Sequence, residues 1–147
     1  MLETVRRGKV KAVCVPAPFR PEFDPETNTI WFDWNADELE LVHELMHAVE
    51  EHDPAFLEAE REYFENRTRG KRLVRLRKLT GNASYNIDEM AFDVGSSCIA
   101  PYAFKDYGGD GYELMSLGAE TLYRSPATFK RDPGMLKWVL YMLERFG

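Results

Sequence analysis

The sequence is poor in cysteine and has no long apolar run. Cys14 and Cys98 are the two cysteines among 147 residues, too few for a disulfide framework and typical of a reducing compartment. No apolar stretch approaches the roughly 18 residues that a membrane span needs. Lys9 and Lys11 interrupt the short apolar stretch near the N-terminus, which makes it a poor match to a signal peptide. We therefore expect a cytoplasmic protein without a membrane segment.

The sequence also has fewer basic than acidic residues. The chain carries 19 Lys and Arg against 25 Asp and Glu, which gives a formal net charge of −6. A net negative charge argues against nucleic acid as the main partner. The segment 67–78 is basic, and we interpret it as a solvated surface that balances an acidic body, rather than as a site for nucleic acid or an acidic partner. A length of 147 residues suits one domain, which we place at 1–147.

Apolar periodicity and turn residues predict an α+β fold. Asn35 and Glu38 have the spacing of a capping box, and the pair Asp53-Pro54 marks the start of a second helix. Segment 67–78 fits a strand and a helix equally well, and the glycine-rich segment 101–111 is expected to be a loop. Both cysteines are expected in the core. The predicted strands are 10–15 and 29–33, and the predicted helices are 36–52, 54–67, 86–99, 112–123 and 133–146.

Residues 43–47 form the motif H-E-x-x-H inside the best of the predicted helices. Positions i and i+4 share one face of a helix, so the imidazoles of His43 and His47 can reach a single metal ion. Glu44 lies one step around the helix, where it can contact a metal-bound water without binding the metal. Zinc is the natural metal for two imidazoles and a carboxylate, with one position left for water. The apolar remainder of the helix favours a buried helix whose polar stripe faces a site over a solvent-facing stripe.

A catalytic zinc site needs a third protein ligand. His52 lies about 180° around the helix from His43, so it is expected to point away. Asp53 has the spacing of the third ligand in another class of zinc protease, but Glu50 stands where that class needs a glycine. The remaining candidates are carboxylates farther along the chain: Glu89, Glu113 and Glu120. The residues alone do not rank the first two of these.

Several later motifs accompany H-E-x-x-H. The pattern E-x-x-S-x-G-x-E occupies 113–120, and it has the following companions: Tyr85 to Glu89, Asp93, Pro101-Tyr102, Lys105, Tyr107, Leu122-Tyr123, Pro126 and Asp132-Pro133. From about residue 35 to the C-terminus, this combination resembles the zincin-like metallopeptidase domains encoded in phages and prophages, often near or fused to head-morphogenesis proteins. The resemblance implies a zincin-like fold, with a small N-terminal sheet packed on the active-site helix and a mainly helical C-terminal part.

The resemblance also implies roles for individual residues. His43, His47 and Glu113 would be the zinc ligands, and Glu44 would be the catalytic base. Leu117 stands where zincins of this class often keep an acid that orients a ligand histidine. The candidates for that orienting role lie elsewhere in the chain: Glu89, Asp93 and Glu120.

The expected activity is that of a zinc metallopeptidase, with a peptide or protein as its substrate. Zinc lowers the pKa of its bound water toward about 7 and polarises the scissile carbonyl. Glu44 would accept the water proton and pass it to the leaving amine. A tyrosine near the glycine-rich segment (Tyr102, Tyr107 or Tyr112) is a candidate oxyanion stabiliser, with simple packing as the alternative. The alternative function is a non-catalytic or degenerate zincin that serves as a phage structural or binding module.

Overall fold

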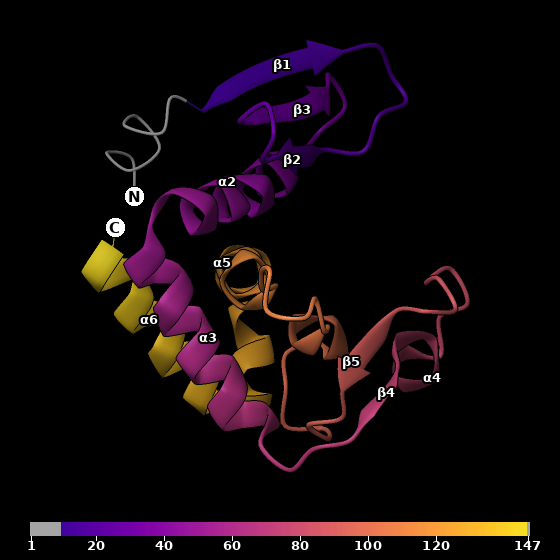
Figure 1. Cartoon of the computed structure of the whole chain (residues 1–147), viewed down its shortest axis with the longest axis vertical. Coiled ribbons are helices and arrows are strands. Elements are labelled where there is room, and N and C mark those ends of the chain that lie inside the picture. Colours follow the sequence, from indigo (N-terminus) through magenta and orange to yellow (C-terminus); the bar gives the residue numbers. More distant parts are fainter. Residues whose placement is uncertain (1–9, 147) are drawn as a thin grey trace.

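The computed structural model describes residues 10–146, and its N-terminal part is a three-stranded sheet (Figure 1). The strands are β1 (Lys11–Val15), β2 (Glu22–Asp24) and β3 (Thr29–Asp33), in the order β1-β3-β2. β1 pairs with β3 in parallel, and β2 pairs with β3 in antiparallel orientation. The two predicted strands are confirmed as β1 and β3. β2 was not predicted, because three residues after a proline-rich turn carry too little periodicity to stand out.

Helix α2 (Glu38–His52) packs beneath this sheet and begins with a capping box. The carboxylate of Asp37 accepts the N–H of Glu40, and the Glu40 side chain accepts the N–H of Asp37. The helix was predicted at the right place, but its capping box was placed two residues too early, at Asn35. The error arose because the same spacing of three residues occurs twice, and Asn35 lies in the turn that follows β3.

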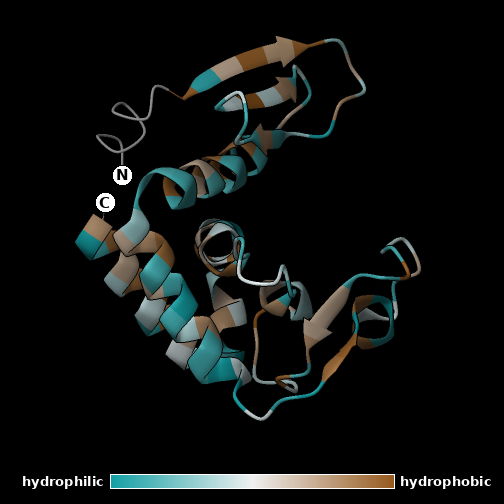
Figure 2. Ribbon diagram, in the orientation of Figure 1, coloured by the Kyte–Doolittle hydropathy of each residue, from teal (hydrophilic) through white to brown (hydrophobic). Residues whose placement is uncertain are grey.

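The other long helices enclose the core. The predicted start of α3 (Pro54–Thr68) is confirmed, since the Asp53 carboxylate caps it and Pro54 is its first residue. α2 packs against α5 (Leu114–Arg124), which in turn packs against α6 (Pro133–Phe146) and the short helix η2 (Pro126–Arg131). Figure 2 shows how polar the visible face of α3 is. Within residues 10–146, no helix combines the length and the apolar character required to cross a bilayer.

The segment between α3 and α5 differs most from prediction. The helix predicted at 86–99 is absent, and β5 (Met90–Phe92) lies there instead. It pairs in antiparallel orientation with β4 (Leu73–Arg75), which leads directly into α4 (Leu76–Thr80). Strand pairing buries Ala91 completely, and this long-range contact overrides the local helix propensity. The predicted loop at 101–111 contains one further element, the short helix η1 (Pro101–Phe104).

Most of the basic side chains in segment 67–78 are solvent-exposed, as predicted, but Arg67 is half-buried. The guanidinium of Arg67 donates to both carboxylate oxygens of Asp132, at 3.0 and 2.9 Å, and to the Ser97 carbonyl at 2.8 Å. Asp132 is buried and also accepts the N–H of Met135 in the first turn of α6. Arg67 therefore ties the end of α3 to the start of α6 and is not part of the solvated surface.

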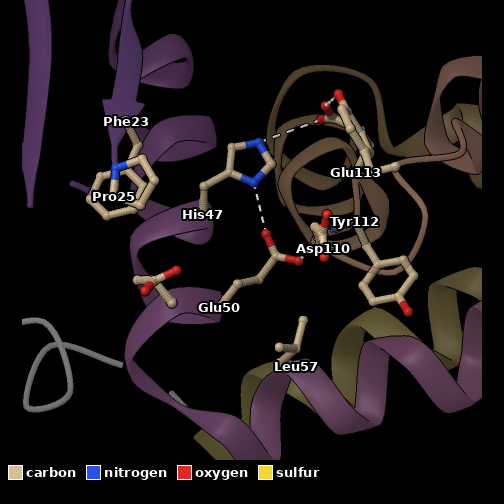
Figure 3. A pocket seen from close by; sticks show the side chains of 11 residues that line it. Phe23, Pro25, His47, Glu50, Leu57, Asp110, Tyr112 and Glu113 are labelled. Carbon is tan, nitrogen blue, oxygen red and sulfur yellow. Dashed lines mark hydrogen bonds and ion pairs between the residues drawn. The ribbon is translucent and has the colours of Figure 1, made fainter. Parts of the chain in front are cut away.

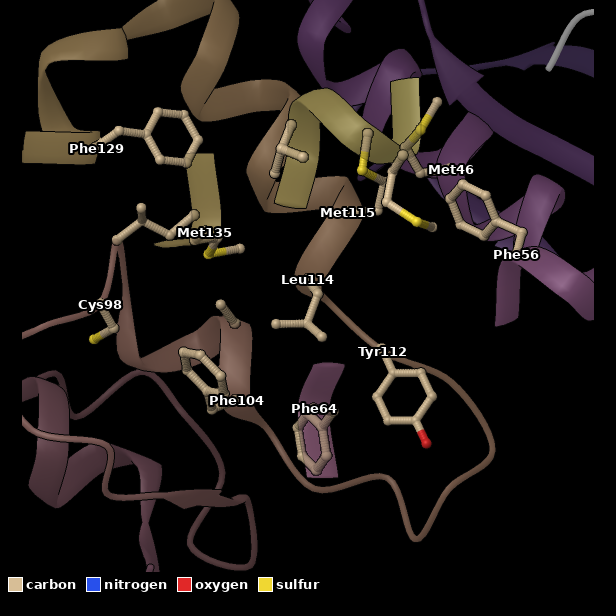
Figure 4. Packing of buried hydrophobic residues seen from close by; sticks show 14 of the residues in the cluster. Met46, Phe56, Phe64, Cys98, Phe104, Tyr112, Leu114, Met115, Phe129 and Met135 are labelled. Carbon is tan, nitrogen blue, oxygen red and sulfur yellow. The ribbon is translucent and has the colours of Figure 1, made fainter. Parts of the chain in front are cut away.

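The core lies where α2, α3, α5 and α6 meet, and it is rich in phenylalanine and methionine (Figure 4). Cys98 is buried in this cluster, as predicted. The prediction for Cys14 is wrong, because it lies on the edge strand β1 and is exposed. The largest fully buried apolar side chains are Phe56, Phe104, Phe129, Leu76, Leu114, Met115, Met135 and Met142. The fold is therefore a mixed α+β fold with its main core among the helices.

Close contact between α5 and α6 depends on Gly118. A Cβ at this position would lie 2.6 Å from Val139 Cγ2, well inside the ordinary carbon–carbon contact of about 3.5–4.0 Å. We expect Gly118→Val to lower the free energy of unfolding by about 2 kcal/mol, measured by urea denaturation. Tyr123→Val is the control, since it places the same β-branched residue at an exposed position of the same helix. Equal losses in the two variants would contradict the packing argument.

Candidate metal centre

Three candidate ligand atoms converge where α2 faces the start of α5. His43 Nε2 and His47 Nε2, one helical turn apart, are separated by 3.3 Å. Glu113 Oε2 lies 3.2 Å from His43 Nε2 and 3.6 Å from His47 Nε2. Among residues 10–146, no second group of three histidine, cysteine or acidic side chains comes together in this way. Of the three carboxylates considered as third ligand, the structure brings Glu113 to the two histidines.

The spacing of these atoms fits a tetrahedral zinc ion. Bonds of about 2.0–2.1 Å in a tetrahedral arrangement separate neighbouring ligand atoms by about 3.3–3.4 Å. The three observed separations, 3.3, 3.2 and 3.6 Å, lie around that value. Two imidazole nitrogens and a carboxylate oxygen are also the donor types that zinc prefers. The residues present therefore fit the metal that H-E-x-x-H implies.

Glu113 is held in place by its immediate surroundings. It was predicted to lie inside a helix at 112–123, but α5 begins at Leu114, so Glu113 lies immediately before the helix. The Tyr107 hydroxyl donates to its Oε1 at 2.5 Å, and the Ser116 hydroxyl donates to its Oε2 at 3.1 Å. Burial by itself would raise the pKa of Glu113, but hydrogen bonds from His43, His47 and Tyr107 hold this pKa well below its usual value. Glu113 is therefore a charged ligand candidate.

Carboxylates also contact the far nitrogen of each histidine ring. His47 Nδ1 donates to Glu50 Oε2 at 2.7 Å, and His43 Nδ1 lies 3.7 Å from Glu120 Oε2. Such partners fix the orientation of a ligand histidine, so that Nε2 faces the metal. Figure 3 shows the His47 ring between Glu50 and Glu113. Glu50 was missed as a functional residue, although its position three residues after His47 on the same helix was a usable signal.

The other candidates for the orienting role lie away from the histidines. Glu89 pairs with Lys105 at 2.9 Å, and Asp93 lies 3.7 Å from Arg72. Among the predicted orienting acids, Glu120 is the one that the structure brings to a histidine. Its contact is at ion-pair distance, which is longer than a direct hydrogen bond.

His52 and Asp53 take structural roles outside the centre. His52 points away as predicted, and its Nε2 lies 2.7 Å from Asn28 Oδ1 in the turn before β3. The carboxylate of Asp53 accepts the N–H groups of Ala55 and Phe56 as the cap of α3. Neither residue therefore competes with Glu113 as the third ligand.

Glu44 connects the centre to the sheet. Its Oε2 accepts the N–H of Phe23, on the edge strand β2, at 2.8 Å. Burial raises the pKa of Glu44, and the nearby charges of His47 and His43 oppose this rise. A carboxylate with a raised pKa accepts a proton more readily, which suits a general base.

Two cavities border the centre, one beside the His47 ring and the other beside the His43 ring. A cavity of about 380 Å³ is lined by His47 and Glu113 together with Phe23, Pro25 and Leu57 (Figure 3). A second cavity, of about 630 Å³, has the following lining residues near the centre: His43, Glu44, Tyr102, Glu120 and Arg124. The candidate ligands therefore border open space in which a small molecule or a chain segment has room to bind.

The three candidate tyrosines differ in their surroundings. Tyr112 is buried, and its ring packs against Phe64 in the core, so it matches the packing alternative. Burial and the charge of Glu113 raise the pKa of Tyr107, so its hydroxyl keeps the proton that it donates to Glu113. The Tyr102 hydroxyl lies 3.2 Å from the Tyr107 hydroxyl and borders the larger cavity.

Comparison with known proteins adds no relative: no family model matches the chain, and neither the curated proteins nor the solved structures contain a match. The function of this centre must therefore be inferred from its own side chains.

The metal-free centre should make stability depend on pH through His47. Burial opposes charge on this ring, but hydrogen bonds from it to Glu113 and Glu50 and the charges of these two residues raise its pKa to about 10. A pKa above the unfolded value of about 6.5 gives stability that is complete below pH 6.5 and is lost as the pH rises through 10. In urea unfolding with a chelator present, His47→Gln should therefore be less stable than wild type at pH 6, with the difference shrinking toward pH 10.

His52→Gln provides the control for this measurement, since His52 lies outside the centre on the same helix. A difference between wild type and His47→Gln that stays constant from pH 6 to pH 10 would contradict the assignment.

Proposed function

We propose that this protein is a zinc-dependent metallopeptidase that hydrolyses peptide bonds, with a zincin-like arrangement of a small sheet on the active-site helix α2. The observation that carries the proposal is the approach of three ligand atoms, His43 Nε2, His47 Nε2 and Glu113 Oε2, to within 3.2–3.6 Å of one another. The position of Glu44 beside them supports a hydrolytic role, because a purely structural zinc site has no use for an adjacent base.

His43, His47 and Glu113 would hold the zinc ion. When bound, zinc supplies a Lewis acid that polarises a carbonyl group and makes water more acidic. Glu44 accepts the proton of the attacking water and delivers it to the leaving amine. Its Oε2 is held by the Phe23 N–H, so we assign the proton transfer to Oε1. Burial of this carboxylate raises its pKa, which favours it as the proton acceptor.

The tyrosines divide into two roles. The Tyr107 hydroxyl is committed to Glu113, so Tyr107 holds the ligand carboxylate in place. Tyr102 borders the larger cavity with its hydroxyl close to that of Tyr107, and it is our candidate for stabilising charge on the carbonyl oxygen. Two cavities border the candidate ligands, one lined by His47 and Glu113 and the other by His43 and Glu44, and this space supports a peptide or protein as the substrate.

One contact favours a second candidate function. The hydrogen bond from Phe23 to Glu44 gives this carboxylate a structural task, because it ties the edge strand β2 to α2. A non-catalytic zincin that acts as a phage structural or binding module would keep Glu44 for that task alone. The two candidates predict opposite results when the basicity of Glu44 is removed.

Glu44→Gln separates these candidates. The glutamine amide oxygen still accepts the Phe23 N–H, so the fold and the metal site are expected to survive. The amide accepts no proton at neutral pH, so the rate of peptide hydrolysis should fall by about 10²–10⁴-fold. Zinc content by atomic absorption and cleavage of a denatured protein or peptide library measure the two effects. Equal hydrolysis by wild type and Glu44→Gln, or none by zinc-loaded wild type, would count against the peptidase.

The identity of the third ligand is tested by a matched pair of variants. Glu113→Gln removes the charged ligand and should weaken zinc binding about 100-fold or more, by analogy with the 10–100-fold effect of losing an outer partner alone. Glu89→Gln makes the same chemical change at a carboxylate that pairs with Lys105 instead of with the histidines. Competition with a coloured chelator gives both affinities. If Glu89→Gln weakened zinc binding more than Glu113→Gln, the assignment would be wrong.

A further inference from the structure

Glu60 on α3 is a fully buried acid that the proposed mechanism does not use. Its exposed fraction is 0%. Its Oε1 accepts the N–H of Met115 at 2.8 Å, in the first turn of α5 and two residues after Glu113. Its Oε2 is buried and has no hydrogen-bond donor among the described residues. A carboxylate in this position would leave an unsatisfied buried charge, which is strongly unfavourable.

The neighbour of Glu60 is Glu50, the acid that binds His47. Burial, the negative charge of Glu50 and a hydrogen bond with Glu50 raise the pKa of Glu60 well above its usual value. Glu50 already accepts two hydrogen bonds, from His47 Nδ1 at 2.7 Å and from the Tyr112 N–H at 2.9 Å. Two carboxyl groups share a hydrogen bond only when one of them carries a proton. With Glu50 acting as the acceptor, the proton belongs on Glu60.

We propose that Glu60 is a positioning residue for the metal centre: its protonated carboxyl group donates a hydrogen bond to Glu50, which holds the His47 ring with Nε2 turned toward Glu113. Through its Oε1, the same group also holds the start of α5, next to Glu113. One side chain on α3 thereby links both halves of the centre. Glu60 lines neither of the two cavities that border the candidate ligands.

Two substitutions at Glu60 separate hydrogen bonding from charge. Glu60→Gln mimics the protonated acid, because its amide group can donate to Glu50 and its oxygen can accept from Met115. Glu60→Met has a similar volume but can form neither bond. Glu62→Met is the control, since Glu62 is exposed on the same helix. Infrared absorption of a protonated buried carboxyl group should be present in wild type at neutral pH and missing from Glu60→Gln.

NMR of the metal-free protein then tests whether His47 Nδ1 is hydrogen-bonded to Glu50. The Nδ1 proton of His47 should give a slowly exchanging imidazole signal in a histidine-labelled NMR spectrum, assigned by its loss in His47→Gln. Glu60→Gln and Glu62→Met should keep this signal, and Glu60→Met should shift or lose it. Zinc affinity should follow the same order, with a dissociation constant raised about 10–100-fold in Glu60→Met and unchanged in Glu60→Gln.

Several outcomes would overturn the proposal. A folded Glu60→Met variant with the wild-type His47 signal and zinc affinity would show that Glu60 positions nothing. If Glu60→Gln weakened zinc as strongly as Glu60→Met, Glu60 would act as an anion and not as a donor. If Glu60→Met fails to fold, the infrared band of the wild type and the zinc affinity of Glu60→Gln test the proposal. Absence of the band, or weaker zinc binding by Glu60→Gln, would then contradict it. The role of this positioning in catalysis rests on the proposed function, whereas the infrared and NMR measurements on the metal-free protein do not depend on zinc. A wild-type chain that binds no zinc would therefore contradict the metallopeptidase but not the hydrogen bond from Glu60 to Glu50.

Discussion

The structure depends most on one interaction, a buried carboxylate held between two imidazoles. Glu113 is only 4% exposed, and a charge so far from solvent is stable only where several donors satisfy it. His43 and His47 reach it from one face of α2, Tyr107 from the preceding loop and Ser116 from α5 itself. Packing of α2 on α5 therefore buries apolar surface and also sets the separation of the ligand atoms. The close approach of α6 at Gly118 supports α5 from its other side.

The centre carries more acid than its histidines can balance. Glu44, Glu50, Glu113 and Glu120 all lie beside the two rings, and Glu60 lies behind them. Without a metal, protonation of His47 relieves part of this excess. Burial lowers the pKa of His47, but the hydrogen bonds and charges of Glu113 and Glu50 outweigh burial and raise this pKa to about 10. A divalent cation supplies two positive charges at the same place and allows the ring to give up its proton. Two neutral imidazoles surrounded by an excess of carboxylates are thus an electrostatic setting that favours the binding of a divalent cation.

Local patterns in the sequence predicted the parts of the centre that lie on one helix. The H-E-x-x-H spacing placed both histidines on one face of α2, and the same logic would have found Glu50 one turn further. Glu113 is 66 positions beyond His47, so its approach is a tertiary contact; the residues alone left it among three candidates, and only the resemblance singled it out. Glu60 stands four residues after Phe56 and four before Phe64, so periodicity places it on the buried face of α3, but its contact with Glu50 is a tertiary one that the local pattern does not show. The wrong helix at 86–99 has the same origin, since pairing of β5 with β4 is a long-range contact.

The number of protein ligands bears on whether the centre is structural or catalytic. Structural zinc sites are closed by four protein ligands, and catalytic sites keep three and leave one position for water or substrate. Two further acids lie near the centre, Glu120 and Glu44, but each contacts another group. Glu120 approaches His43 at Nδ1, on the side of the ring away from Glu113, and Glu44 is tied to the Phe23 N–H. Three converging candidate ligands beside two cavities, with Glu44 one step away on the helix, therefore support the hydrolysis that we propose over a purely structural role.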